Sequence, residues 1–130
     1  MLIDKKLLDS VTSKAKVSDR LRMNFNFHES LDAKAQRLLN ALEPGTVLPI
    51  HRHQHTAETH IVLRGAIKVL FYNADKVLTN EFLLNPLEGV YGVHTPAGQW
   101  HTIEVLESGT MIFEVKDGPY TPLSAEDIMQ

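Results

Sequence analysis

Three histidines and one glutamate stand at spacings that would let their side chains share a metal ion. The segment GTVLPIHRHQHTAETHIVLRG, residues 45–65, places His51, His53 and Glu58 in the order G-x5-H-x-H-x4-E-x6-G, and His101 follows downstream in PAGQWH. Imidazole nitrogens and a carboxylate oxygen suit one divalent transition metal, such as Zn, Fe, Ni or Mn. The chain has no cysteine, so a site of this kind must use nitrogen and oxygen ligands.

The spacing of the first two histidines is typical of an extended strand. Side chains two residues apart in a strand point to the same side, so His51 and His53 would face one ion while Arg52 points away. Glu58 would then return on the neighbouring strand. We therefore predict one strand over residues 47–53 and a second one from Glu58.

The bulk properties fit one domain and exclude several classes of partner. A chain of 130 residues can bury about two thirds of its unfolded surface around a single core. Its 13 basic and 16 acidic residues give a net charge of -3, with neither sign in a block, so we expect no nucleic-acid or membrane partner. The N-terminal segment lacks the apolar run of a signal peptide or spanning helix, which predicts a cytoplasmic protein.

The pattern along the chain predicts an all-β domain preceded by a helix. Apolar residues at near-helical spacing over residues 4–18 predict a helix that docks on a larger body. We place this docking helix at 1–19, a barrel at 20–118 and a tail at 119–130. Turn signals separate the short strand-like runs, which favours an antiparallel barrel or jelly roll. Those runs are residues 20–28, 37–42, 47–53, 58–63, 66–72, 76–84, 90–94, 101–106 and 110–116.

The histidine motifs resemble the paired motifs of the cupin superfamily. The second motif, G-x5-P-x-G-x2-H-x3-N, departs from the pattern at Gly89, one place early, and at Val105, which replaces the asparagine. Within the superfamily, QRLLNALEPGTVLPIHRH and NPLEGVYGVHTPAGQWHTI are similar to small bacterial metalloproteins of the WbuC type, whose genes are often found in O-antigen sugar clusters. The motif positions that match are Gly45, His51, His53, Glu58, Gly65, Pro96, Gly98 and His101.

The resemblance implies a jelly-roll barrel, or double-stranded β-helix, with a metal at its mouth. It implies that His51, His53, Glu58 and His101 are the ligands, and that the protein is a homodimer. Four protein ligands leave one or two positions free on a five- or six-coordinate ion, which favours a site for ligand chemistry. They would also complete a tetrahedral structural site, and that alternative stays open.

Two further groups of residues are candidates for catalysis or substrate binding. Glu58 and His60 share one strand face, so both are candidate catalytic residues, although His60 could equally be a hydrogen-bonded core histidine. The polar positions of the alternating run 20–28 would line a substrate pocket if their apolar neighbours pack on the helix or a second subunit. They would otherwise form the solvated face of an edge strand. The candidate pocket residues are Arg22, Asn24, Asn26, His28 and Tyr91.

Three functions are compatible with these residues. The first is a metal-dependent enzyme, such as an isomerase or epimerase, that acts on a small polar metabolite, for example a sugar intermediate of surface-polysaccharide synthesis. The second is a dioxygenase with Fe(II) at the same ligands. The third is a metal-bearing module that binds a sugar or metabolite without turnover, because no dedicated acid, base or nucleophile stands out beyond the ligands.

Overall fold

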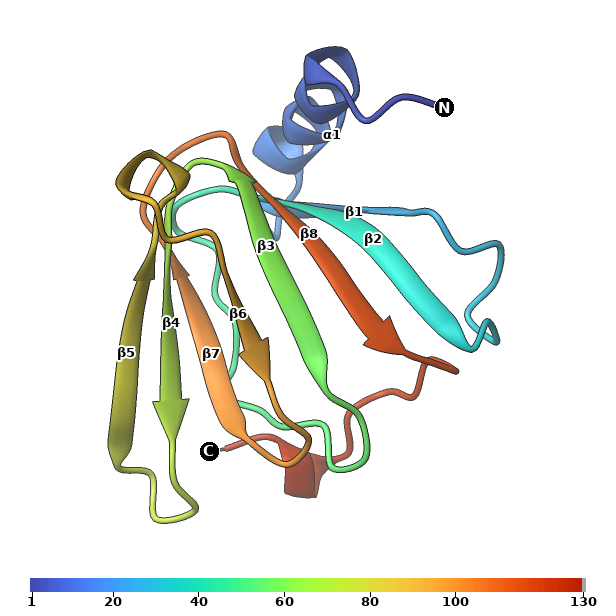
Figure 1. The fold of residues 1–130 in the computed structure, drawn as a ribbon. Coiled ribbons are helices and arrows are strands. Elements are labelled where there is room, and N and C mark those ends of the chain that lie inside the picture. The colour runs from blue at the N-terminus through green and yellow to red at the C-terminus, as the bar shows by residue number, and fades with distance from the viewer. Residues whose placement is uncertain (130) are drawn as a thin grey trace.

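The computed structural model describes residues 1–129, which form a helix followed by strands and two short 3₁₀ helices (Figure 1). No helix in this part of the chain has the length and apolar run needed to cross a bilayer. Position 130, the last residue of the predicted tail 119–130, lies outside the described residues. The elements are α1 (Lys5–Val17), β1 (Arg22–Asn26), β2 (Ala35–Leu42), β3 (Glu58–Arg64), β4 (Ile67–Tyr72), β5 (Leu78–Leu84), η1 (Pro86–Glu88), β6 (Gly92–Thr95), β7 (Trp100–Val105), β8 (Thr110–Asp117) and η2 (Ala125–Asp127).

The strands form two antiparallel sheets that pack face to face (Figure 1). Within residues 1–129 the larger sheet has the order β1-β2-β8-β3-β6, and the smaller sheet has the order β5-β4-β7. Strand β8 pairs with both β2 and β3, so it joins the beginning and the middle of the chain. The prediction of an all-β domain with an N-terminal helix is confirmed.

The inner faces of the two sheets meet in an apolar core. In β4 every second residue is buried, as expected for a strand with one face against a core. Val62 from β3 and Ile112 from β8 contribute the opposite layer, and Ile67 and Val69 contribute the layer from β4. Each of these four side chains is essentially inaccessible to solvent. The core therefore holds the sheets together and leaves their ends free for other roles.

Helix α1 covers the outer face of the larger sheet. Asp4 caps its first turn, because the Asp4 carboxylate accepts a hydrogen bond of 3.0 Å from the Leu7 N–H. Val11 and Ala15 are buried against Leu39 and Met111. The apolar positions of β1 and the residue that follows it pack on the same cluster, so the helix covers them; they are Met23, Phe25 and Phe27.

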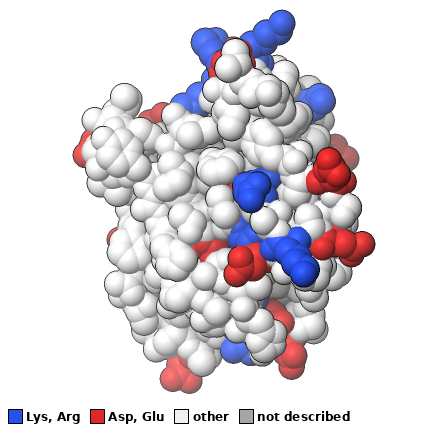
Figure 2. All heavy atoms as spheres, turned by 45° about the vertical axis from the view of Figure 1, so that its right-hand side comes forward, with Lys and Arg blue, Asp and Glu red and all other residues white. Residues whose placement is uncertain are grey.

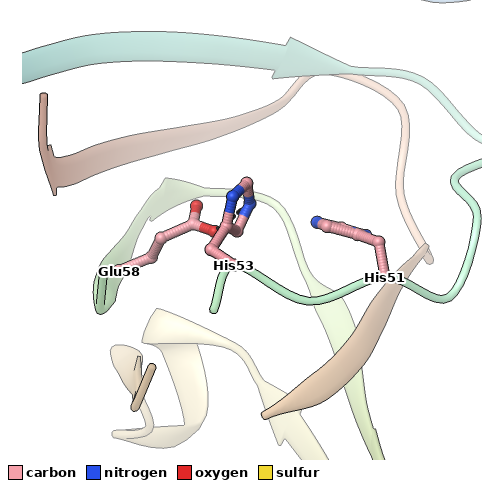
Figure 3. A group of neighbouring side chains, drawn as sticks. All are labelled: His51, His53 and Glu58. Carbon is pink, nitrogen blue, oxygen red and sulfur yellow. Dashed lines mark ion pairs between the residues drawn. The ribbon is translucent and has the colours of Figure 1, made fainter. Parts of the chain in front are cut away.

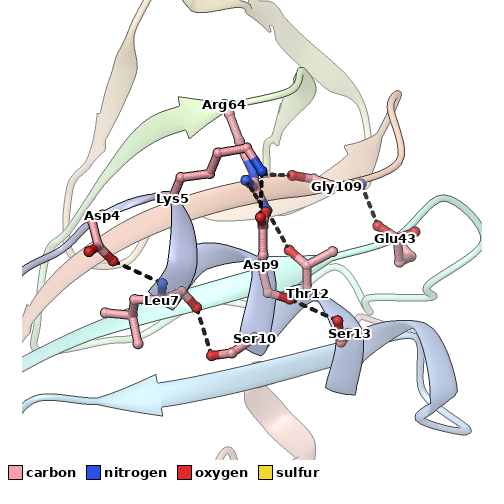
Figure 4. Close-up of polar contacts among 10 residues, drawn as sticks. All are labelled: Asp4, Lys5, Leu7, Asp9, Ser10, Thr12, Ser13, Glu43, Arg64 and Gly109. Carbon is pink, nitrogen blue, oxygen red and sulfur yellow. Dashed lines mark hydrogen bonds and ion pairs between the residues drawn. The ribbon is translucent and has the colours of Figure 1, made fainter.

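A network of polar contacts fixes the helix to the sheet at the end of β3 (Figure 4). The Arg64 guanidinium donates to Asp9 Oδ1 at 2.7 Å, to Thr12 Oγ1 at 3.0 Å and to the Gly109 carbonyl at 3.0 Å. A guanidinium satisfied by three acceptors is held in one orientation. Arg64, which would otherwise face solvent at the edge of the sandwich, therefore links α1 to the turn before β8.

A buried carboxylate completes this network. Glu43 accepts a hydrogen bond from the Gly109 N–H at 2.6 Å (Figure 4). It accepts a second one from Ser108 Oγ at 2.5 Å. Charge-assisted bonds of this length are strong, so they compensate for the burial of Glu43. We call this network the helix clasp. It comprises Asp9, Thr12, Glu43, Arg64, Ser108 and Gly109.

One motif glycine is required by the backbone beside the helix clasp. Gly65 makes the turn between β3 and β4 with a φ of +85°. A Cβ atom at this position would lie 2.7 Å from Thr110 Cα, closer than any real contact. Only glycine combines this left-handed conformation with such a close approach.

Charged side chains are interspersed on the surface. On the face shown in Figure 2, basic and acidic side chains lie next to each other within a larger uncharged area. This distribution agrees with the small net charge of -3.

The structure corrects one predicted strand. Residues 47–53 do not form a strand; within them only His51 pairs, in two isolated bridges, to His101 and to Ile128. Pro49 has no N–H for a ladder, and its carbonyl accepts a hydrogen bond from a side chain, His51 Nδ1, at 2.9 Å. The histidines are therefore presented by a loop and not by a regular strand.

Candidate metal centre

The candidate ligands come from a loop, a strand start and a strand of the opposite sheet. His51 pairs with His101 through the backbone: the His51 N–H donates to the His101 carbonyl at 3.0 Å, and the His101 N–H donates to the His51 carbonyl at 2.9 Å. His101 lies on β7 of the smaller sheet, whereas Glu58 is the first residue of β3 in the larger sheet. The loop therefore joins the two sheets at the end opposite the helix clasp.

Three of the four predicted ligands converge closely (Figure 3). One ligand atom each from His51, His53 and Glu58 lies within 4.8 Å of the others. His101 lies beside this group and not inside it: its Nε2 is 3.9 Å from Glu58 Oε1, and its ring centre is 4.4 Å from that of His51. The structure thus gathers a three-residue core of the site and places His101 next to it.

Two of the histidines are already held in the form that binds metals. His51 Nδ1 lies 2.9 Å from the Pro49 carbonyl, and His101 Nδ1 lies 2.9 Å from the Gln99 carbonyl. A carbonyl only accepts, so each Nδ1 carries the proton and donates it. The lone pair is then on Nε2 of each ring. Metal-bound histidines are commonly oriented by a hydrogen bond of this kind.

Glu58 offers an oxygen that the protein leaves unsatisfied. Its Oε1 is buried and finds no hydrogen-bond partner within residues 1–129. His53 Nε2 lies only 2.7 Å from this oxygen, but the ring is not aligned to donate a hydrogen bond to it. Two ligands at neighbouring positions of one ion stand about 3 Å apart at ordinary bond lengths of about 2.1 Å. The distance between Oε1 and the imidazole nitrogen is therefore compatible with two ligands of one cation.

The electrostatics favour the protonation states that a metal requires. Burial favours the neutral form of Glu58, but the contact with His53 and the nearby His60 outweigh burial and lower the Glu58 pKa to about 2. Burial lowers the pKa of His101 to about 4, assisted by His51. Burial also lowers the pKa of His51. At neutral pH the site therefore presents the Glu58 carboxylate and the neutral imidazoles of His51 and His101, which are the ligand forms of these side chains.

A second buried group adjoins the first through Glu58. His60 Nε2 lies 3.1 Å from Glu114 Oε1 and 3.6 Å from Glu58 Oε2. Burial opposes the charged form of His60, but the hydrogen bond to Glu114 and the two carboxylates outweigh burial and raise the His60 pKa. Glu114 is itself 3.5 Å from Lys116 Nζ. Glu58, His60 and Glu114 thus form a second group of potential ligands, whose ligand atoms lie within 4.8 Å of one another and which shares Glu58 with the first.

Sequence reasoning did not identify Glu114. It lies opposite His60 because β8 pairs with β3 in the register Glu114↔His60. The only signal in the sequence is one carboxylate inside the apolar run MIFEVK. Its meaning depends on which strand lies next to β8, and the sequence does not reveal that order.

Polar atoms that lack a partner are concentrated on one surface. Among residues 1–129, four buried side-chain atoms find no hydrogen bond: Asn40 Oδ1, Glu58 Oε1, His60 Nδ1 and Thr95 Oγ1. We call these the open atoms. The strand register places all four residues on the inner face of the larger sheet, with Thr95 directly opposite Glu58. Since buried polar groups are almost always satisfied, the open atoms are positions where a water molecule, an ion or a ligand can bind.

One family model matches most of the chain. It covers residues 3–84 and is described as a domain of unknown function, DUF6016. The chain belongs to this family. Among curated proteins, none matches it significantly.

Solved structures similar to this member of the family have the cupin fold. CapF from Staphylococcus aureus, a capsular polysaccharide assembling protein, matches with a TM-score of 0.66 and 22% identity over 82% of this chain. KdgF from Halomonas sp. matches with a TM-score of 0.61 and 16% identity over 81% of this chain and 85% of its own. The cupin domain of Schizosaccharomyces pombe Cnp3 matches with a TM-score of 0.59 and 11% identity over 74% of this chain and 64% of its own. This chain spans 28% of the length of CapF.

The polar positions of β1 do not reach the candidate metal centre. Asn24 and Asn26 are exposed on the inner face of the edge strand, which β2 and β8 separate from β3. Arg22 donates to the Val47 carbonyl at 3.0 Å, and His28 contacts the backbone of Arg37. Their substrate-binding role stays a prediction.

Three other residues from the sequence lie on the outside. Tyr91 is 58% exposed, at the edge of the larger sheet, and its role in substrate binding also stays a prediction. His94 Nδ1 lies 2.9 Å from Thr59 Oγ1 on the outer face. His55 is exposed in the loop after His53. Neither histidine belongs to the groups of potential ligands found within the described chain.

Proposed function

We propose that this protein is a metal-dependent enzyme that acts on a small polar metabolite, such as a sugar intermediate of surface-polysaccharide synthesis. The observation that carries the proposal is the convergence of His51, His53 and Glu58 around an oxygen that lacks a protein partner. The similarity to CapF, a capsular polysaccharide assembling protein, and the WbuC-type motifs support the substrate class. A cytoplasmic location and a homodimer belong to the same proposal.

In this proposal some residues of the site bind the ion and another contacts the substrate. His51, His53 and Glu58 hold the ion, and His101 completes the set from β7. The bound ion would act as a Lewis acid that polarises a substrate oxygen. His60 is the second catalytic candidate beside Glu58, because its buried Nδ1 is one of the open atoms and can hydrogen-bond to a substrate.

Metal analysis and turnover test this proposal together. Protein purified without oxygen should contain about one transition-metal ion per chain, and His53→Ala should abolish both the ion and turnover of sugar intermediates. His94→Ala is the matched control, because His94 lies on the outer face of the larger sheet and outside the ligand groups. Turnover by metal-free protein would overturn the proposal. Iron together with oxygen uptake would instead identify a dioxygenase.

A binding module without turnover is the second candidate. The observation that favours it is the pairing of His60 with Glu114, which occupies the one imidazole nitrogen nearest to Glu58 Oε2. Saturable binding of a sugar to the metal-loaded protein, with no product after long incubation, would support the module. Product formation that depends on the ion would exclude it.

A further inference from the structure

A small cavity lies beside the metal centre, between the histidine loop and the C-terminal segment. Its volume is about 270 Å³. One wall is the loop at 52–56, the second is the end of β8 with Lys116, and the third is the segment 117–127 with Tyr120. The cavity is just below the range of about 300–1,000 Å³ that is usual for ligand pockets, so it suits a small molecule.

The C-terminal wall is anchored to the same loop that carries the histidines. Asp127 accepts hydrogen bonds from Arg52 Nε at 3.1 Å and from Gln54 Nε2 at 2.6 Å. The backbone adds two bonds: the Arg52 N–H donates to the Asp127 carbonyl at 3.0 Å, and the Met129 N–H donates to the Ile50 carbonyl at 2.8 Å. Because wall and loop are joined on both sides of the histidines, the cavity has a fixed position relative to the ion site.

His53 connects the cavity to the candidate ion site, because it lines the cavity and is also one of the candidate ligands. Its side chain lines the cavity and is 21% exposed, whereas those of Glu58 and His101 are 5% and 3% exposed. Lys116, at the cavity wall, stands opposite Glu58 in the register of β8 and β3. Glu58 Oε1 and Thr95 Oγ1, both open atoms, lie in the same row of the sheet. His53 and Lys116 thus connect the cavity to the buried Glu58, and none of the four residues with open atoms lines the cavity itself.

The chemistry of the walls favours a neutral ligand with many hydroxyl groups. Basic and acidic side chains line the cavity together, so a strongly charged ligand of either sign would meet repulsion. Gln54 and Thr56 offer both donors and acceptors, which hydroxyl groups match because they also do both. Tyr120 is 48% exposed and presents an aromatic ring to the cavity. A ring of this kind supplies apolar contact area next to a polar tip.

We propose that this cavity is the substrate-binding site, that it takes a neutral polyhydroxylated molecule no larger than a monosaccharide, and that the C-terminal segment 117–127 determines this size limit. The inference rests on the proposed function, since the ligand is the substrate of the adjacent metal centre. It moves the predicted substrate site from the polar face of β1 to the C-terminal wall.

Binding of simple sugars to the metal-loaded protein tests the inference. The probes are glucose, galactose, mannose, fucose, rhamnose and N-acetylglucosamine, each titrated by ligand-observed NMR against the full chain. Tyr120→Ala should weaken binding about 3- to 10-fold. Leu87→Ala is the control, because it truncates an exposed apolar side chain, 93% exposed, that does not line the cavity. Circular dichroism and metal content would confirm that both variants stay folded and loaded.

Each outcome decides the inference separately from the proposed function. Weaker binding in Tyr120→Ala alone supports the cavity. Unchanged binding in Tyr120→Ala, or equal loss in both variants, places the sugar elsewhere and overturns the inference while the metal-dependent enzyme stands. If none of the six sugars binds the loaded wild type, the ligand class is wrong, and the loss of turnover in His53→Ala still decides the proposed function.

Discussion

Strand β3 begins in the metal centre with Glu58 and ends in the helix clasp with Arg64, and its two ends treat charge in opposite ways. In the helix clasp, Arg64 and Glu43 find donors and acceptors in the protein itself. In the metal centre, Glu58 and His60 each keep an open atom. The difference separates polar groups that hold the fold together from polar groups that are kept for an outside ligand.

Glu58→Gln should give the largest effect, on metal affinity. The amide keeps the shape of the side chain but removes the negative charge that faces the ion, so affinity should fall on the order of 100-fold or more. Isothermal titration with Zn²⁺ measures it. Glu43→Gln is the matched control at the other end of the sheet and should leave the affinity unchanged. Equal affinities in wild type and Glu58→Gln would contradict the assignment of the ligand.

Acid should destabilise the metal-free protein through the metal centre. The folded-state pKa of His101 is about 4, against 6.5 for the free side chain, so between these values the unfolded chain binds a proton that the folded chain does not. The free energy of unfolding should therefore fall as pH falls from 6.5 to 4, by about 3 kcal/mol for His101 alone. The lowered pKa of Glu58, about 2, acts in the same direction below pH 4.5.

Urea denaturation with a chelator, at a series of pH values, checks this dependence. His101→Asn should flatten the curve between pH 6.5 and 4, whereas His55→Ala should not. A stability that stays constant over this interval would show that His101 is not a buried neutral imidazole.

Arg64→Ala tests the helix clasp. The variant leaves the Asp9 carboxylate with Lys5 alone and removes the link to Gly109, so it should lower the free energy of unfolding by about 2 kcal/mol. Lys5→Ala, at an exposed pair on the same carboxylate, should cost less than about 0.5 kcal/mol. Metal affinity should stay unchanged in both. A loss of metal binding in Arg64→Ala would show that the two ends are not independent.

Thr95→Val should have the smallest effect on stability, and it compares an open atom with a hydrogen-bonded one. Thr95→Val removes an open hydroxyl and should change the stability of the metal-free protein by less than about 0.5 kcal/mol, because no hydrogen bond is lost. Ser108→Ala removes a donor to Glu43 and should cost about 1.5 kcal/mol. Thermal denaturation of both variants gives the difference. Similar losses would mean that Thr95 is satisfied after all.

The sequence predicted the ligands better than the way they are presented. The motif placed His51, His53 and Glu58 near each other, and the alternation over residues 20–28 predicted a strand with one apolar side. That this side packs on the helix was one of the alternatives left open. It did not predict the loop at 47–53, because the apolar spacing before His51 resembles that of a strand. The local sequence does not show that this segment has no partner strand to pair with. The pattern of apolar residues in one sequence reveals the periodicity of a segment but not which strands pair with each other.

The rest of the site could not be predicted because it depends on contacts between distant segments. Glu114 meets His60 through the β8–β3 register, and the cavity lies between the histidine loop and the C-terminal segment, which bonds such as that of Arg52 to Asp127 join. The histidines of the motif can be recognised as potential ligands from their spacing in the sequence. The possible roles of Glu114 and Tyr120 depend on the residues that surround them in the folded protein.

The mutual backbone pair of His51 and His101 makes the ion site preorganised. Ordering a loop when the ion binds would oppose binding by about 1–2 kcal/mol of conformational entropy per residue. Here the backbone bonds between His51 and His101 already order the loop in the metal-free protein. Capture of the ion should therefore be fast and leave the overall fold unchanged. Empty protein and loaded protein would share one shape, so that the metal switches chemistry on without moving the scaffold.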